Sequence, residues 1–222
     1  MYRPARRIRA SVCANQTAAD VAACVEGGAD AVGVLVQVKH RAEDAIDLDH
    51  AANLMDMVPP YVGRYAVTHA TEIREICDLR NLAIDTIQLH EDIDPAIIPE
   101  IRRGFPRVRL LKAIHVVDEG SISMAERWQG LVEGLVLDSV NKIENRIGGT
   151  GLTHDWSISA RIIKATKVPV VLAGGLRPEN VCEAVRAVLP WGVNVNSGVE
   201  RGEVKMRDLV EGFVRGANAA CD

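Results

Sequence analysis

"VPVVLAGGLRPENVCEAVRAV", residues 168–188, contains in one stretch the pattern that decides the fold. A run of Val and Leu leads into two glycines, and a segment with apolar residues at helical spacing follows. A nearly continuous apolar run is typical of a strand buried on both faces of a parallel sheet, and the later spacing is typical of an amphipathic helix. The stretch therefore predicts one β-strand, a tight turn and one α-helix.

This strand–helix unit occurs eight times along the chain, with a helical pattern after every apolar run. The predicted strands are residues 7–13, 31–37, 61–68, 84–90, 107–116, 132–138, 168–175 and 192–198. No Pro/Ser-rich linker, charge block or low-complexity tract divides them. The pattern predicts an α/β protein with a single (β/α)8 TIM barrel over residues 1–222. A doubly wound open sheet, which uses the same alternation, is the alternative.

Composition excludes several classes of function. The 222 residues are 48% apolar, with a net charge of -4 and no clustered basic face, so no nucleic-acid partner is expected. No apolar run approaches the roughly 20 residues of a membrane span, and the basic N-terminus lacks the apolar segment of a signal peptide. The five cysteines are scattered without a C-x-x-C pair, which favours a reducing cytoplasm over a disulfide framework or a zinc site.

The barrel prediction indicates where chemistry should lie, because barrel active sites form at the carboxyl ends of the strands and in the loops that follow. The residues at these predicted ends are Cys13, Gln37 to Arg41, Thr68, His69, Gln88, His90, Lys112 to His115, Asp138, Ala173 to Gly175 and Asn194 to Gly198. We expect the substrate to contact Arg41, Gln88, His90 and Lys112. His69 and His115 could face one another across the mouth, but no nearby carboxylate spacing makes a convincing metal site.

Glycine-rich loops follow three consecutive strands. They are "GGTG" at 148–151, "AGG" at 173–175 and "NSG" at 196–198. Glycines let backbone N–H groups approach a ligand, and in barrels the loops after the last two strands frequently bind phosphate. One such loop is more often only a tight turn, whereas three in succession favour a phosphate site. The predicted phosphate-binding residues are Gly149, Gly174, Gly175, Asn196, Ser197 and Gly198.

An acid and a base are available at the same predicted rim. Cys13 ends the first strand, where a thiolate near a bound anion can act as a general base. Asp138 ends the sixth strand, where a partly closed pocket can raise its pKa enough for it to donate a proton. Each residue also has a purely structural explanation, as a small core residue or as a salt-bridge partner. Together with a phosphate grip, they suit the isomerisation of a sugar phosphate without a metal or cofactor.

Several motifs occur in an order that is similar to a known family. They are "VCA" at 12–14, "TIQLHED" at 86–92, "LLKAIHV" at 110–116, "LVLDS" at 135–139, "GGTGLTHDW" at 148–156, "LAGGLRPENVCEAV" at 172–185 and "VNVNSGVE" at 193–200. The chain resembles phosphoribosylanthranilate isomerase, the barrel enzyme of tryptophan biosynthesis. The resemblance runs over nearly the whole chain.

The resemblance implies an Amadori rearrangement, in which an aminoaldose phosphate opens its ring and becomes an aminoketose phosphate. It assigns the general base to Cys13 and the general acid to Asp138. It assigns the phosphate grip to Gly149, Gly174, Gly175, Ser197 and Gly198, mostly through backbone N–H groups. No cofactor or metal is implied. Family members occur as monomers and dimers, so a small phosphosugar and at most a second copy of the chain are the expected partners.

The chain departs from the family pattern near the end of the site that would hold the anthranilate. Ser11 replaces the lysine and Ala14 the glycine of a usual "KICG", and strand two is altered, with Arg41 nearest to the arginine that contacts the anthranilate carboxylate. "YAVTH" stands for "VGVF", and Asn194 replaces an acid. Two alternatives therefore stay open: a divergent isomerase acting on a different phosphosugar, and a non-catalytic barrel that binds a phosphate ligand.

Overall fold

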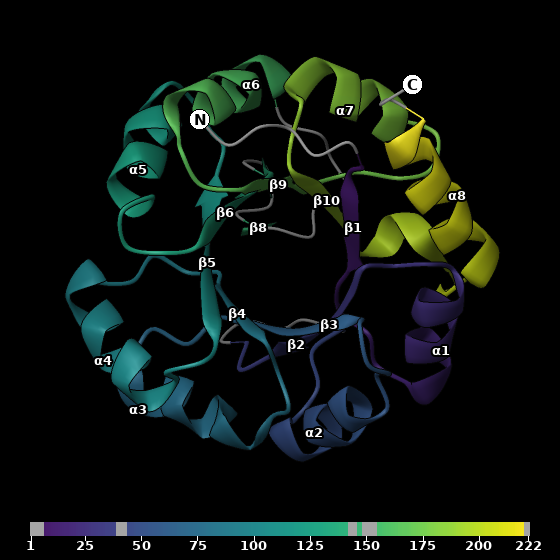
Figure 1. Ribbon diagram of the computed structural model, residues 1–222, viewed down its shortest axis with the longest axis horizontal. Coiled ribbons are helices and arrows are strands. Elements are labelled where there is room, and N and C mark those ends of the chain that lie inside the picture. Colours follow the sequence, from purple (N-terminus) through teal and green to yellow (C-terminus); the bar gives the residue numbers. More distant parts are fainter. Residues whose placement is uncertain (1–6, 39–43, 142–145, 148–154, 220–222) are drawn as a thin grey trace.

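A ring of parallel strands surrounded by helices forms the molecule in the computed structural model (Figure 1), which describes residues 7–38, 44–141, 146–147 and 155–219. The strands of the ring are β1 (Arg9–Val12), β2 (Ala31–Val36), β3 (Gly63–Thr68), β4 (Thr86–Leu89), β5 (Arg109–His115), β6 (Gly134–Asp138), β9 (Val170–Leu172) and β10 (Gly192–Val195). Two short hairpins lie outside the ring, β7 (Val140–Asn141) with β8 (Arg146–Ile147) and β11 (Glu200–Arg201) with β12 (Val204–Lys205).

The strands close in the order β1-β10-β9-β6-β5-β4-β3-β2, with β1 paired to both β2 and β10. Every pair in the ring is parallel, which requires a crossover after each strand. The closed ring confirms the predicted barrel and excludes the open-sheet alternative.

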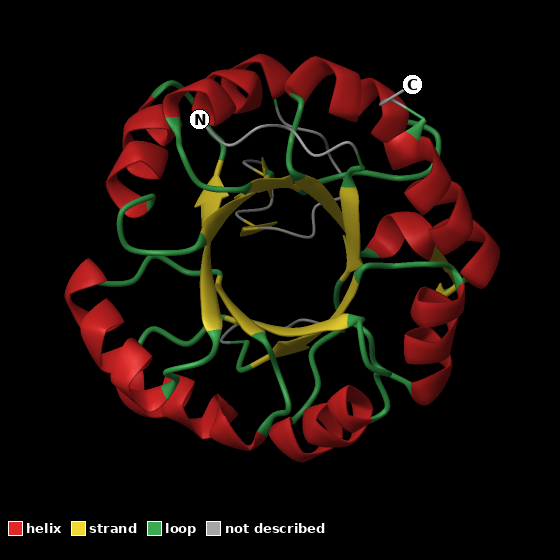
Figure 2. Cartoon of the chain, in the orientation of Figure 1, coloured by secondary structure: helices red, strands yellow, loops and turns green. Residues whose placement is uncertain are grey.

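Helices supply these crossovers and form the outer layer (Figure 2). They are α1 (Ala18–Glu26), α2 (Leu48–Asp56), α3 (Ile73–Cys77), α4 (Ile98–Gly104), α5 (Gly120–Trp128), α6 (Trp156–Ala165), α7 (Val181–Val188) and α8 (Arg207–Asn218), with 3-10 turns η1 (Asp78–Asn81), η2 (Pro95–Ile97) and η3 (Ser197–Val199). Thr17 starts α1 with a reciprocal capping box to Asp20, which satisfies two backbone donors at that helix end. Asp47 and Asp155 cap α2 and α6 in a similar way with their side chains.

Two predicted strands end earlier than expected, just before the glycines that follow them. β9 ends at Leu172 and β10 at Val195, whereas the sequence patterns ran on to residues 175 and 198. Gly174 and Gly175 have φ of +82° and +63°, a left-handed conformation that cannot continue a strand. The glycines therefore belong to the loops at the barrel mouth.

Successive side chains of a strand point to opposite faces, and the buried apolar residues therefore form two separate clusters. The larger layer lies between the strands and the helices and includes Val12, Leu137 and Val195. A smaller cluster of Val136, Val171 and Ala173, with Leu111 and Trp191 packed against it, fills the inside of the ring. Because neighbouring side chains on a strand point to opposite faces, a residue's place in this alternation decides whether it can line the mouth.

Candidate active site

Cys13 and Asp138 lie at the inner rim of the barrel, at the ends of β1 and β6. Asp138 is two residues beyond the inward-facing Val136, so it belongs to the same face of β6. It is 8% exposed, and its charge raises the pKa of the Cys13 thiol, which shows that the two groups are within electrostatic reach. The structure therefore brings the predicted base and acid into one site.

The Cys13 thiol favours its protonated form at neutral pH. Burial raises its pKa to about 12, Lys205 lowers it, and Asp138 and Asp44 raise it. The backbone N–H of Cys13 donates to the Val195 carbonyl at 3.0 Å, and the thiol is directed at the same oxygen at 3.6 Å. Desolvation outweighs the nearby cation, so the surroundings of the strand end favour the thiol over the thiolate.

The pKa of the Asp138 carboxyl is raised, which is the direction that a proton donor near neutral pH needs. Burial raises its pKa to about 6, although the Ser139 N–H, which donates to Oδ1 at 2.7 Å, lowers it. Above pH 6 the carboxylate is the major form of Asp138. Between the two pKa values the Cys13–Asp138 pair therefore carries one proton, which resides on sulfur.

The loops after β6, β9 and β10 touch one another through their backbones, and we call Ser139, Gly174, Leu176 and Gly198 the glycine wall. A Cβ on Gly174 would lie 2.8 Å from the Ser139 nitrogen, and one on Gly198 would lie 2.0 Å from the Leu176 carbonyl oxygen. Only glycine fits at these contacts. Ser197 is exposed at the start of η3, beside Gly198. Gly149 lies outside the described residues.

The Asn196 side chain is held by protein partners. Its amide donates to Asp44 Oδ2 at 2.7 Å, and its oxygen accepts from the buried Lys205 ammonium, which also pairs with Glu200. The predicted phosphate contact of this side chain therefore competes with two bonds already made. The sequence did not indicate Lys205 on β12 as a site residue, because it follows the end of β10 by ten residues and belongs to no motif.

Three imidazoles line another part of the mouth, and we call His69, His90 and His115 the histidine wall. The rings of His69 and His90 stack with centroids 4.5 Å apart, and His115 meets His90 edge-on at 4.9 Å. His69 Nδ1 also lies 2.7 Å from Glu91 Oε1. Burial lowers the pKa of His115 to about 4, so its ring is neutral at pH 7. In the strand order, β3 and β4 lie opposite β9 and β10.

The four residues predicted to contact the substrate have different outcomes. Gln88 and His90 lie two positions apart on β4 and its end, buried on one face. Lys112 does not join them: its ammonium lies 5.5 Å from the Trp128 ring centroid on α5 and donates to the Ala113 carbonyl. The Lys112 side chain lies on the outer face of β5, between the strand and α5, where burial lowers its pKa to about 8. Arg41 lies outside the described residues.

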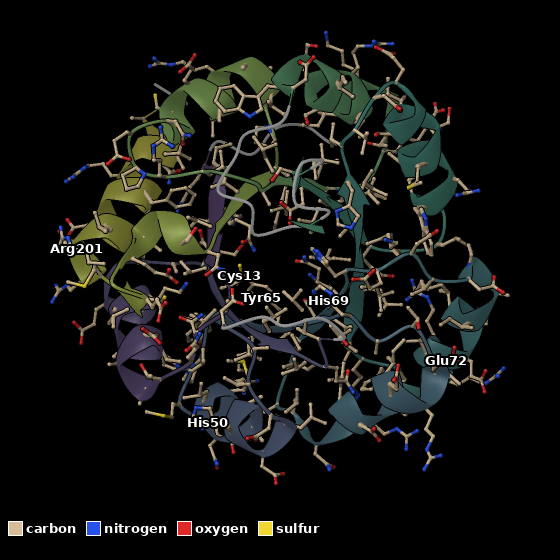
Figure 3. The ribbon with its side chains drawn as sticks, turned by 180° about the vertical axis from the view of Figure 1, so that it is seen from behind. Cys13, His50, Tyr65, His69, Glu72 and Arg201 are labelled. Atoms are coloured by element: carbon tan, nitrogen blue, oxygen red, sulfur yellow. The ribbon has the colours of Figure 1, made fainter. Side chains whose placement is uncertain are left out.

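Figure 3 shows Cys13, Tyr65 and His69 inside the ring of strands, while His50, Glu72 and Arg201 lie at the periphery. Tyr65 is another residue that the sequence reading did not assign to the site. Among the described side chains, no group of three or more His, Cys, Asp or Glu residues is arranged to hold a metal ion. In the described ranges no helix has the length and apolar character needed to cross a bilayer.

Comparisons with known proteins agree with this geometry. Residues 10–216 match the family described as N-(5'phosphoribosyl)anthranilate (PRA) isomerase. The chain is 37% identical over 194 residues to N-(5'-phosphoribosyl)anthranilate isomerase 2 of Methanosarcina mazei, covering 87% of this chain and 86% of that protein. It is 38% identical over 202 residues to the Methanocella arvoryzae enzyme, covering 90% and 92%.

Solved structures show the same relationship. The phosphoribosyl anthranilate isomerase of Thermotoga maritima superposes with a TM-score of 0.82 at 29% identity, covering 96% of this chain and 99% of that one. A further isomerase structure, with a TM-score of 0.79 and 27% identity over the same shares, contains reduced 1-(o-carboxyphenylamino)-1-deoxyribulose 5-phosphate. The chain therefore belongs to the N-(5'-phosphoribosyl)anthranilate isomerase family.

Proposed function

We propose that this chain isomerises N-(5'-phosphoribosyl)anthranilate to 1-(o-carboxyphenylamino)-1-deoxyribulose 5-phosphate, with Cys13 as the general base and Asp138 as the general acid. The observation that carries the proposal is the placement of a thiol and a carboxyl with a raised pKa at one inner rim, in a chain of this family. The reaction is an internal redox exchange between two carbons, so it needs proton transfer and positioning only. We expect it to serve tryptophan biosynthesis in the cytoplasm, without a cofactor.

The protein carries out two proton transfers in the proposed reaction, and a tautomerisation follows. Asp138 protonates the furanose ring oxygen, the bond from that oxygen to C1 breaks, and the nitrogen lone pair forms a C1=N iminium. The Cys13 thiolate then removes the C2 proton, the electrons of that C–H bond form the C1=C2 bond of an enaminol, and the iminium electrons return to nitrogen. Tautomerisation moves a proton from the C2 hydroxyl to C1 and gives the C2 ketone, so C2 is oxidised while C1 is reduced. Cys13 has gained one proton and Asp138 has lost one, so the atoms balance and the transfer of one proton from Cys13 to Asp138 restores the starting form.

The mechanism requires one particular distribution of the proton between Cys13 and Asp138. The reactive form has the proton on Asp138 and a thiolate at Cys13, whereas the pKa values of the two groups favour the reverse. Both forms carry the same total number of protons, so only the surroundings of the two groups decide between them. Lys205 is the cation that favours the thiolate, and its burial at 3% exposure keeps solvent from screening it.

The loops that carry the glycine wall, together with Gly175, are the proposed phosphate site. Their backbone N–H groups are the proposed donors, and the exposed Ser197 adds a hydroxyl. The family resemblance adds Gly149. His69, His90 and Gln88 lie on β3 and β4 or directly after them, and these strands lie opposite β9 and β10. These three residues are therefore proposed to face the anthranilate, and Arg41 is proposed as the partner of its carboxylate.

Complementation of a tryptophan auxotroph that lacks this step, together with turnover by the purified protein, tests the proposed activity. Cys13→Ser and Asp138→Asn should each lower kcat by roughly 10²–10⁴-fold while leaving inorganic phosphate binding intact. A folded wild-type protein without turnover would overturn the activity. Full activity in both variants would overturn the residue assignment.

Two further expectations concern the form of the protein. We propose that residues 1–222 act as a single barrel domain, as a monomer or a homodimer. One related Thermotoga maritima isomerase is described as dimeric. Sedimentation of the purified chain distinguishes the two states, and a larger assembly would contradict both.

A further inference from the structure

A buried hydrogen-bonded network lies one layer beneath the Cys13 thiol. Tyr65 on β3 is 5% exposed, and its hydroxyl accepts from Asn194 Nδ2 at 2.8 Å. Ser11 on β1 is the register partner of Asn194, and its Oγ donates to the Val193 carbonyl at 3.2 Å. The Tyr65–Asn194 bond therefore joins β3 to β10 directly beneath the bond between the Cys13 N–H and the Val195 carbonyl.

Tyr65 reaches this position because β2 leaves room for it. Gly33 is the register partner of Tyr65, and a Cβ at Gly33 would lie 2.3 Å from the tyrosine Cζ. The ring therefore lies over β2 and extends toward β1 and β10, which are the next strands around the barrel. No side chain larger than glycine at residue 33 would allow this path.

The network ends where the thiol is positioned. Ser11 and Asn194 are register partners across β1 and β10, and the next bond of that ladder joins the Cys13 N–H to the Val195 carbonyl. Burial raises the Tyr65 pKa well above its ordinary value, and the charge of Cys13 contributes in the same direction, so the two groups are neighbours. Figure 3 shows both labelled within the ring of strands.

We infer that Tyr65 is a positioning residue for the Cys13 base: its hydroxyl, bonded to Asn194, ties β3 to β10 beneath the thiol with uncharged groups. The inference rests on the proposed function of Cys13. It also joins two changes seen in the sequence, at residues 65 and 194, into one structural unit. An uncharged unit leaves the charge around the thiol to the groups that face it from other elements, which are Lys205, Asp138, Asp44 and Cys24.

Tyr65→Phe tests the inference, with Tyr61→Phe as the matched control because Tyr61 is fully exposed. Tyr65→Phe removes only the hydroxyl, so kcat should fall roughly tenfold through misplacement of the base while KM stays within about twofold. Tyr61→Phe should leave both unchanged. A Tyr65→Phe protein with a lowered Tm and a wild-type kcat would overturn the positioning role, because a merely structural residue gives that result.

Two other variants keep the inference testable if Tyr65→Phe does not fold. Asn194→Ala removes the donor to the tyrosine hydroxyl and should lower kcat in the same way, at unchanged KM. Asn194→Asp places a carboxylate beside the tyrosine and should move the alkylation of Cys13 by iodoacetamide, followed on the Cys13 peptide, to higher pH. Unchanged kcat in Asn194→Ala, or an unshifted alkylation profile in Asn194→Asp, would overturn the inference.

The alkylation profile also separates this inference from the proposed function. If the wild-type protein does not turn over phosphoribosylanthranilate, the proposed function fails. The dependence of Cys13 alkylation on Asn194 and Tyr65 would still be measurable in that protein, and it alone would then decide whether the network acts on the thiol.

Discussion

The glycine wall and the histidine wall occupy different parts of the barrel mouth and are built in opposite ways. In the first, backbones approach so closely that Gly174 and Gly198 have no space for a methyl group. In the second, His69, His90 and His115 fill the space with stacked rings. A backbone surface offers N–H donors at fixed positions, whereas a side-chain surface can change shape without moving the strands.

This contrast fits a substrate with one constant end and one variable end. Phosphate has the same shape in every phosphosugar, and a rigid backbone surface suits it. The group attached to the amine differs between phosphosugars, and side chains are where a chain of this fold can change its preference. The departures from the family pattern at residues 11, 65 and 194 lie in the strands β1, β3 and β10, and not in the loops of the glycine wall.

The largest expected effect is on the glycine wall itself. Gly198→Ala should lower the free energy of unfolding by roughly 3 kcal/mol or more, because the new Cβ would overlap the Leu176 carbonyl of a neighbouring loop. Urea denaturation measures this change. Gly130→Ala, at an exposed position with nothing within 4 Å, is the matched control. Equal stability of the two variants would break the contrast between the walls.

The next effect concerns the acid that stands beside the glycine wall. The pKa of Asp138 is about 6 in the folded protein against an ordinary value of 3.8, so its ionisation costs stability progressively as pH rises from about 4 to about 6. Asp138→Asn removes that cost. The difference in the free energy of unfolding between the variant and wild type should be about 3 kcal/mol more favourable to the variant at pH 8 than at pH 4. The variant should also lose turnover. A stability difference independent of pH would contradict the raised pKa.

A smaller effect is expected when a ring is removed from the histidine wall. His115→Ala loses the contact of Nε2 with the His90 carbonyl at 3.0 Å and the edge contact between the rings. The cost should be about 1–2 kcal/mol, less than the addition of one methyl group to the glycine wall. Urea denaturation at pH 7 compares the two directly. A larger loss for His115→Ala would reverse the contrast.

The smallest effect is expected at Ala14, where the backbone has a conformation that favours glycine. Ala14 follows Cys13 with φ of +56°, in the left-handed region. Ala14→Gly relieves that strain and loses a buried methyl group, so the net change should lie between zero and a gain of about 1 kcal/mol. Thermal unfolding monitors it. A loss above about 1 kcal/mol would mean that packing of the methyl group outweighs the backbone.

The fold could be predicted from the sequence, and a reacting pair could be proposed from it, because both depend on local patterns. Apolar runs followed by helical spacing predicted eight strands, and the rule that chemistry lies at strand ends selected Cys13 and Asp138. The rule failed for Lys112, one residue away from an inward position. A shift of one residue moves a side chain to the other face of a strand, and a short apolar run does not specify its phase.

The remaining site residues depend on contacts between distant parts of the chain. Lys205 approaches Cys13 because β12 pairs with β11 and its backbone N–H donates to Asp20 on α1 at 2.9 Å. Tyr65 reaches Asn194 across two intervening strands because residue 33 is glycine. The pKa of Cys13 likewise follows from burial and from charges on other elements, none of which a strand-end motif records.

By itself, the sequence determined that this protein is a βα barrel of a recognisable family with a thiol, a carboxyl and glycine loops at the strand ends, because periodicity and motif are properties of adjacent residues. Tertiary structure alone decided which side chains enter the mouth, that the thiol favours its protonated form, and that Tyr65 braces the strand beneath it. These features are set by register, desolvation and the approach of distant charges, and they exist only after the ring has closed.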